Sequence, residues 1–147
     1  KMLTASNLAG KAINITKTTA PHAISYSLTS YFGVPHGQAV SLTLGEFLEY
    51  NYNVTETDAT VSGNAEYIKK SISELIKLMG CSNAADAKSK ISELMKSIGL
   101  KTRLSELDII SQEDLKIIID NVNLERLQNN PRVLRGENLE IILRKIL

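Results

Sequence analysis

Residues 20–40 read APHAISYSLTSYFGVPHGQAV. The first part predicts a helix over Ala20–Phe32. The Gly33-Val34-Pro35 break ends it, because proline lacks an N–H and disfavours helical backbone in the residue before it. Proline is favourable at the first position of a helix, so a second helix is expected over about residues 35–52. The stretch therefore predicts two consecutive helices that meet at a tight turn.

Apolar residues recur at helical spacing beyond this stretch. The helical spacing begins at about Thr60. One apolar stripe is followed by Gly80, and a second stripe is followed by Gly99. Glycine at such positions is typical of a helix C-terminus. The two ends resemble each other, so we expect two neighbouring helices that face one core. The stripes consist of Ala65, Ile68, Ile72, Leu75, Ile76 and Met79, and of Ala87, Ile91, Leu94, Met95 and Ile98.

Further helices are predicted at both ends of the chain. Ser111 and Asp114 form a capping-box pattern, and the last helix is expected over about Glu137–Leu147. A helix from Leu3 to about Ile15 carries a face of small and apolar residues, and we expect it to be buried. The fold class predicted from these patterns is all-α, a helical bundle.

Composition excludes several classes of protein. The chain has 147 residues, 43% of them hydrophobic, and a formal net charge of +1, which argues against a nucleic-acid-binding surface. Its single cysteine, Cys81, permits no intrachain disulfide, which fits a reducing compartment, and we expect a cytoplasmic location. Thr18–Gly45 contains no Asp, Glu, Lys or Arg, but it is too polar and too broken by Gly and Pro to cross a membrane. Such a run favours a packed site or a domain interface.

Both histidines of the chain, His22 and His36, lie inside this uncharged run. A histidine in a buried segment is more often a core or capping residue than a metal ligand, and no H-x-x-x-H or H-E-x-x-H motif is present. The turn between the two predicted helices, however, allows both imidazoles to reach one point. Imidazole is a ligand for several divalent metals, so the pair is a candidate metal site.

Three segments resemble the iron-containing (group III) alcohol dehydrogenase family: Ala9–Ala12, Pro21–Tyr26 and Tyr31–Val40. The third contains Pro35-His36-Gly37, and 14 positions separate the two histidines. Gly99–Leu107 and Asn130-Pro131-Arg132 are similar to the closing helices of the family. Within the family, the sequence of Lys11–Tyr26 is most similar to that of phosphonoacetaldehyde-reductase-type members.

The resemblance implies that residues 1–147 are the C-terminal helical, metal-binding domain of a longer oxidoreductase. It implies that His22 and His36 are ligands of Fe²⁺, with Zn²⁺ as the alternative, and that NAD(P) binds mainly to an N-terminal α/β domain absent from this chain. The substrate is then a small aldehyde or alcohol, and phosphonoacetaldehyde is one candidate. Full-length members are expected to form homo-oligomers, and the isolated segment is expected to be inactive.

One residue departs from the family pattern, because many relatives carry a histidine where Tyr26 stands. Tyr26 is four residues after His22, so the two side chains share a helix face. Packing beside the metal is one role for Tyr26. A catalytic role, in which its hydroxyl donates to a substrate oxygen, is the other. Lys17, Thr18 and Thr19 are candidates to meet an anionic substrate tail, and a solvated helix end is the alternative.

Two other functions remain open at this level. A non-catalytic helical interaction module would use the charge-poor first 60 residues as a partner surface. A lyase similar to dehydroquinate synthase would use related metal and NAD sites. Two converging imidazoles argue against the interaction module. The sequence of residues 32–37 favours an alcohol dehydrogenase over a lyase similar to dehydroquinate synthase.

Overall fold

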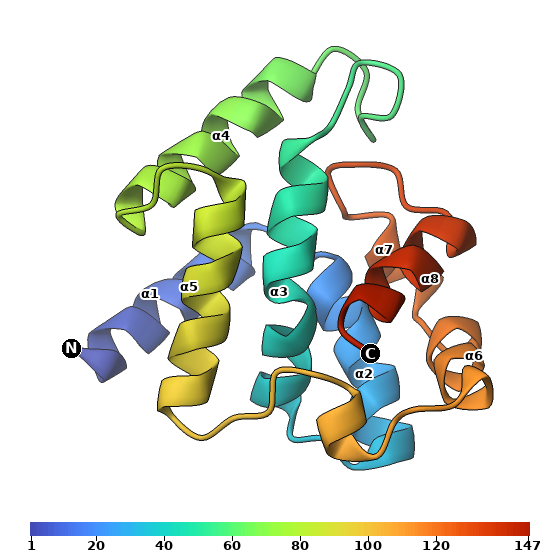
Figure 1. The fold of residues 1–147 in the computed structure, drawn as a ribbon. Coiled ribbons are helices and arrows are strands. Elements are labelled where there is room, and N and C mark those ends of the chain that lie inside the picture. Colours follow the sequence, from blue (N-terminus) through green and yellow to red (C-terminus); the bar gives the residue numbers. More distant parts are fainter.

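A computed structural model describes all residues, 1–147, as an all-helical structure (Figure 1). One isolated β-bridge, between Ala59 and Arg132, is the only extended pairing. The elements, in chain order, are α1 (Met2–Ile15), α2 (Ala20–Phe32), α3 (His36–Tyr52), α4 (Ala65–Leu78), α5 (Ala84–Ser97), the 3₁₀ turn η1 (Ser105–Leu107), α6 (Gln112–Asp120), α7 (Leu124–Leu127) and α8 (Gly136–Lys145). The predicted fold class is therefore confirmed.

Helices α2 and α3 pack against each other and form the centre of the larger core (Figure 1). The turn between them occurs where the sequence predicts it, because Gly33 adopts a left-handed conformation with φ of 66°. A side chain is strained in that conformation, whereas glycine is not. The core around the two helices contains residues from α2, α3, α5, α6 and α8 and from the segments that connect helices, including the fully buried Ile24, Leu28, Leu104, Leu115 and Leu143.

The stripes of α4 and α5 are only partly buried, and they do not face a single core. Ile68, Ile72 and Ile76 of α4 pack in a second, smaller cluster, which Ala84 and Ala87 of α5 complete. Further along α5, Met95 belongs to the larger core. The predicted stripe members Leu75, Leu94 and Ile98 are exposed, because the apolar arc of each helix is wider than the contact it makes.

The C-terminal third closes the larger core through α6 and α8. Ser111 caps α6 in the predicted capping box, with its Oγ accepting from the backbone N–H of Asp114 at 3.0 Å. The short helix α7 was not predicted. The final helix, α8, buries Leu139, Ile142 and Leu143.

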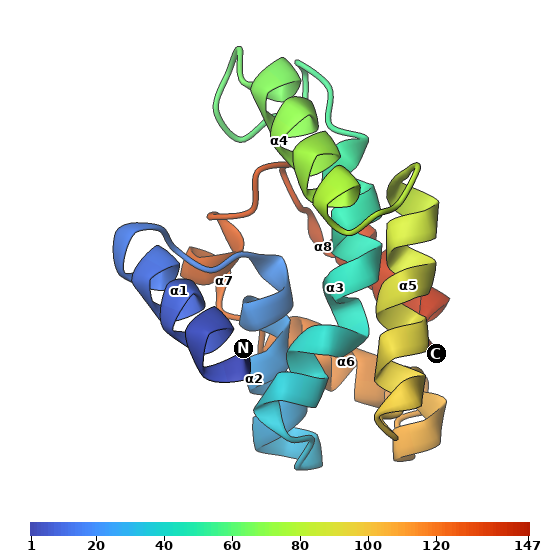
Figure 2. The ribbon, with the colours of Figure 1, turned by 90° about the vertical axis from the view of Figure 1, so that its left-hand side faces the viewer.

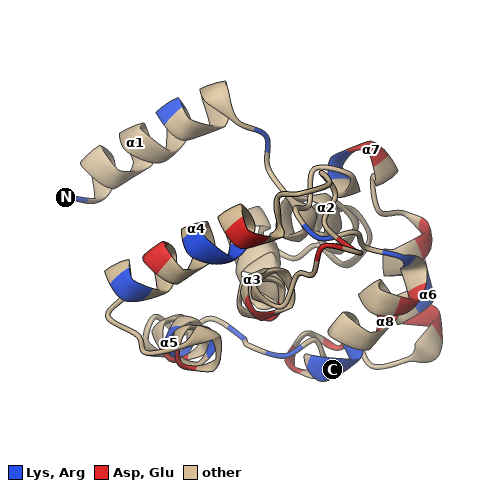
Figure 3. Ribbon diagram, turned by 90° about the horizontal axis from the view of Figure 1, so that it is seen from above, with Lys and Arg blue, Asp and Glu red and all other residues tan.

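The prediction that the first helix is buried is wrong. Helix α1 has no buried residue, and Leu3 and Ile15 are almost fully exposed. It stands apart from the other helices when the molecule is seen from above (Figure 3). Its apolar face has no partner within residues 1–147. Neither α1 nor any other helix is long and apolar enough to cross a membrane.

Candidate metal and substrate site

The two histidines come from the starts of two consecutive helices, and their rings lie close together. His22 lies in the first turn of α2 and His36 is the first residue of α3. Their ring centroids are 5.5 Å apart with an interplanar angle of 65°. The Gly33 turn reverses the chain direction, and this reversal brings residues 14 positions apart into contact. The predicted juxtaposition of His22 and His36 is therefore present.

Ser25 contacts the His36 ring and fixes its orientation. Its Oγ, which is completely buried, donates its only proton to the carbonyl oxygen of His22 at 2.8 Å. The same Oγ is 3.3 Å from Nδ1 of His36, so in this contact Nδ1 must be the donor. A neutral imidazole with a proton on Nδ1 carries its lone pair on Nε2. This arrangement is the usual way in which an outer hydrogen bond prepares a histidine for a metal.

The electrostatic surroundings favour a neutral His22 imidazole. The pKa of His22 is lowered by its burial, then by the nearby His36, and then by the positive charge of Arg126. A lowered pKa keeps the His22 ring deprotonated, and therefore able to act as a ligand, over a wider range of pH.

Tyr26 lies beside the pair, one helical turn after His22. Its ring centroid is 5.9 Å from that of His36. Its hydroxyl oxygen accepts a hydrogen bond from Nη1 of Arg126 at 2.8 Å, and the Arg126 guanidinium lies over the ring, 4.6 Å from the centroid. The phenol proton of Tyr26 is not used in this contact and remains available to a further acceptor.

Sequence reasoning missed Arg126, which reaches the site from α7. The signal that was present is Asn123, whose Oδ1 accepts from the backbone N–H of Arg126 at 2.9 Å and begins the helix. An Asn N-cap predicts a helix start, but it does not tell which distant element that helix meets. Helix α7 packs on α2, and this contact carries Arg126 to Tyr26.

A cleft of about 610 Å³ connects these residues. Figure 2 shows α1, the start of α2 and α7 on the same side of the molecule. Of the three candidates for contact with an anionic substrate tail, Lys17 and Thr18 line the cleft and Thr19 does not. The lining residues are Ile13, Thr16, Lys17, Thr18, His22, Tyr26, His36, Asn123, Glu125, Arg126 and Asn129.

The residues present fit one part of a metal site. Two neutral imidazoles with metal–nitrogen bonds of about 2.1 Å hold their ring centroids roughly 5 Å apart around one ion, which agrees with the separation of His22 and His36. No third histidine, cysteine or carboxylate of residues 1–147 joins them. Residues 1–147 thus offer two candidate ligands, and His36 is an exposed residue of the cleft lining.

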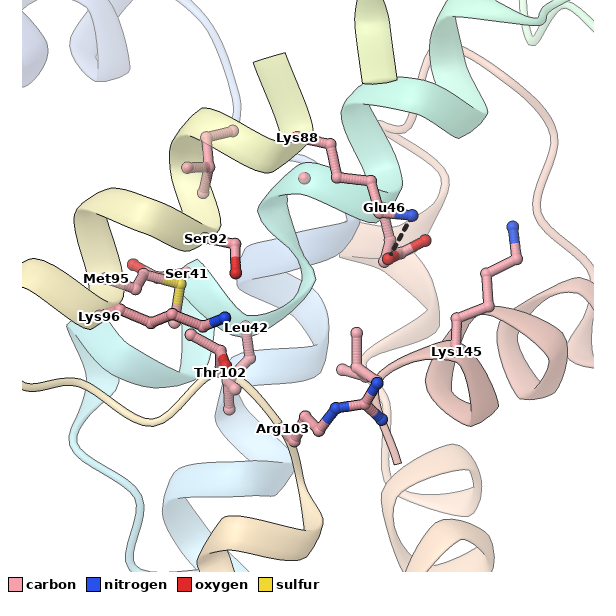
Figure 4. Close-up of a pocket in the computed structure, with 13 residues that line it drawn as sticks. Ser41, Leu42, Glu46, Lys88, Ser92, Met95, Lys96, Thr102, Arg103 and Lys145 are labelled. Carbon is pink, nitrogen blue, oxygen red and sulfur yellow. Dashed lines mark ion pairs between the residues drawn. The ribbon is translucent and has the colours of Figure 1, made fainter. Parts of the chain in front are cut away.

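A second cleft, of about 340 Å³, lies between α3, α5 and the end of α8 (Figure 4). It is lined by the basic residues Lys96, Arg103 and Lys145, and by the ion pair of Lys88 Nζ with Glu46 Oε1 at 2.7 Å. The other carboxylate oxygen of Glu46 is buried and has no hydrogen-bond partner. None of the residues predicted for the site lies in this cleft.

Comparisons with known proteins give a consistent result. A family model described as Fe-containing alcohol dehydrogenase family, C-terminal, matches residues 1–147. Phosphonoacetaldehyde reductase of Streptomyces viridochromogenes is 29% identical over 139 residues, which are 95% of this chain and 34% of that protein. The crystal structure of sulfoacetaldehyde reductase from Bifidobacterium kashiwanohense in complex with NAD⁺ superposes with a TM-score of 0.67 and 26% identity, over 88% of this chain and 31% of that one. The chain spans about a third of the length of both relatives.

Proposed function

The chain belongs to the Fe-containing alcohol dehydrogenase family as a C-terminal domain, and from that premise we propose that it supplies two metal ligands and a wall of the substrate pocket to a metal-dependent, NAD(P)-linked aldehyde reductase. The observation that carries the proposal is the convergence of His22 and His36 beside the buried Ser25. The proposed substrate is a small aldehyde or the corresponding alcohol, and phosphonoacetaldehyde is the first candidate.

Four residues of the cleft, together with the buried Ser25, have roles in this proposal. His22 and His36 hold a divalent metal, Fe²⁺ or Zn²⁺, through neutral nitrogens. When bound, the metal supplies Lewis acidity at a carbonyl oxygen, and the nicotinamide supplies or takes up the hydride. Ser25 holds the His36 ring in the tautomer that leaves Nε2 free. The hydroxyl proton of Tyr26 is placed to donate to a substrate oxygen, while Arg126 holds the phenol oxygen.

The remaining part of the site is proposed to come from the rest of the full-length protein. The relatives are about three times as long as the matched region, and one of them was crystallised with NAD⁺. The open side of His36 and the unpartnered face of α1 are the surfaces of this chain that such a region would cover. Covering them would also exclude water from the cleft, which strengthens electrostatic interactions there.

The test is metal analysis of the full-length protein by mass spectrometry, beside the His22→Ala/His36→Ala double variant. Asn129→Ala is the matched control, because it changes the wall of the same cleft without removing an imidazole. We expect near-stoichiometric iron or zinc in the wild type and the control, and loss of metal and of NAD(P)H-dependent aldehyde reduction in the double variant.

Two outcomes contradict the proposal in different ways. Full metal content and activity in the double variant would refute the ligand assignment. A wild-type protein without metal and without turnover, after anaerobic preparation with iron supplied, would refute the metal chemistry. In that case the exposed apolar α1 would favour the interaction-module alternative.

A further inference from the structure

Arg126 projects into the histidine cleft with most of its hydrogen-bonding capacity unused. A guanidinium has five N–H donors, and the only side-chain hydrogen bond of Arg126 is the one from Nη1 to Tyr26. No carboxylate forms an ion pair with it, although Glu125 lines the same cleft. The charge of Arg126 is therefore not neutralised by a direct partner.

The guanidinium is also held in place. Its central carbon lies over the Tyr26 ring, 4.6 Å from the centroid, and the Nη1 bond to the phenol oxygen holds it there. An arginine ordered in this way loses less side-chain entropy when it binds a ligand than a freely moving one. Lys17, which also lines the cleft, adds a second positive charge without an ion-pair partner.

The spacing suits a small bifunctional molecule. Tyr26 contacts both His36 and Arg126. The centroid of its ring is 5.9 Å from that of His36 and 4.6 Å from the guanidinium carbon of Arg126. A molecule that places its carbonyl at the histidines reaches Arg126 with a substituent only a few bonds away. Phosphonate and sulfonate groups match the guanidinium fork, because two oxygens can accept parallel N–H bonds.

We infer that Arg126 is the specificity-determining residue of the site and selects aldehydes that carry a tetrahedral oxyanion, a phosphonate or a sulfonate, a few bonds from the carbonyl. The inference rests on the proposed reductase function, because it takes the histidine cleft as the substrate pocket. It assigns a role to a residue on α7 that neither the motif of the histidines nor the family match identifies.

The test compares kcat/KM of full-length wild type, Arg126→Leu and Arg126→Lys with three aldehydes: phosphonoacetaldehyde, sulfoacetaldehyde and the neutral propanal. Arg126→Leu should lower kcat/KM for the preferred anionic aldehyde by about 10- to 100-fold, mainly through KM, since a charge-assisted hydrogen bond contributes about 1.5–3 kcal/mol. Propanal should lose less activity than the anionic aldehydes, because it makes no direct contact with the guanidinium and loses only the support that Arg126 gives to the Tyr26 phenol. Arg126→Lys should recover part of the loss, and the ratio of the two anionic substrates identifies the favoured oxyanion.

A binding measurement separates this inference from the proposed function. Methylphosphonate and methanesulfonate, which cannot react, are titrated into the full-length protein by calorimetry. Binding of either one that is lost in Arg126→Leu and kept in Arg103→Leu, where the arginine lies in the other cleft, supports the anion site even if no aldehyde is reduced. Equal loss of activity on propanal and the anionic aldehydes, or unchanged anion binding in Arg126→Leu, would overturn it and leave Arg126 as a positioning residue for Tyr26.

Discussion

The side-chain amides of Asn51 and Asn130 donate to each other across 79 positions of sequence. Nδ2 of Asn51 is 3.1 Å from Oδ1 of Asn130, and Nδ2 of Asn130 is 2.8 Å from Oδ1 of Asn51. Both residues are buried. This pair joins the end of α3 to the Asn130-Pro131-Arg132 segment, and that segment follows the helix that carries Arg126.

The reciprocal pair predicts a specific sensitivity at position 130. Asn130→Asp keeps the shape of the side chain but removes both donors, so the carboxylate faces the amide oxygen of Asn51 and the carbonyl of Arg132. Leaving buried polar groups unpaired costs about 1–3 kcal/mol for each group. We expect the midpoint of thermal unfolding of the full-length protein to fall by several degrees. Asn129→Asp, at an only partly buried neighbouring position, serves as the control and should have little effect.

Ser25→Ala should weaken metal binding without unfolding the protein. The variant removes the oxygen that accepts from Nδ1 of His36, and loss of such an outer hydrogen bond typically lowers metal affinity by about 10- to 100-fold. Competition with a chelator in the full-length protein measures the change. Ser27→Ala is the matched control, since the Oγ of Ser27 is buried without a partner and its removal breaks no hydrogen bond. Equal metal affinity in both variants would show that Ser25 does not orient His36.

Gly45→Ala should be destabilising because α3 and α5 approach closely there. A Cβ at Gly45 would lie 3.1 Å from Cγ and 3.3 Å from the Cα of Lys88. The second contact is with backbone, so the helices must move apart, at a cost of about 1–3 kcal/mol. Chemical denaturation followed by circular dichroism measures it. Gly136→Ala meets open space, and it should change stability by no more than about 1 kcal/mol.

Protonation of Asp58 should lower the stability of the protein in acid. Burial alone would raise the pKa of Asp58, but hydrogen bonds from Thr55 and Arg132 and the charge of Arg132 outweigh burial and lower the pKa below its ordinary value of 3.8. The stabilisation is therefore complete above the unfolded-state pKa and is lost as the pH falls through the lower folded-state pKa. Unfolding monitored between about pH 5 and 2 should show a smaller acid dependence for Asp58→Asn than for the wild type. An identical acid dependence in the two proteins would contradict this role.

Much of the fold is encoded in short local signals, and these were readable. Gly33 with Pro35, the Ser111–Asp114 box and Gly80 each mark a helix end at the position where the structure has one. These signals are local because a cap or a left-handed glycine satisfies the backbone within a few residues. The meeting of His22 and His36 was predictable for the same reason, since the turn between their helices is short.

The features that sequence reasoning missed depend on distant partners. The face of α1 has the composition of a buried helix, but nothing in residues 1–147 packs on it. The spacing of Leu94 and Ile98 is that of a stripe, yet neighbouring helices cover only part of α5. The Asn123 N-cap signals a helix start near Arg126, but it does not show that Arg126 contacts Tyr26, 100 positions earlier. Periodicity shows which face is apolar and does not show what covers it.

Helix α1 is isolated from the other helices and should therefore unfold locally without them. A helix of 14 residues that has no tertiary contacts depends on its own backbone hydrogen bonds, and isolated helices of this length are marginal in water. Its amide protons should therefore exchange with deuterium through fraying of α1 alone, whereas those in the middle of α2 and α3 should exchange only when the core opens. A protein surface that packs on α1 would slow this exchange, so deuterium uptake at residues 2–15 reports directly on whether that helix is covered.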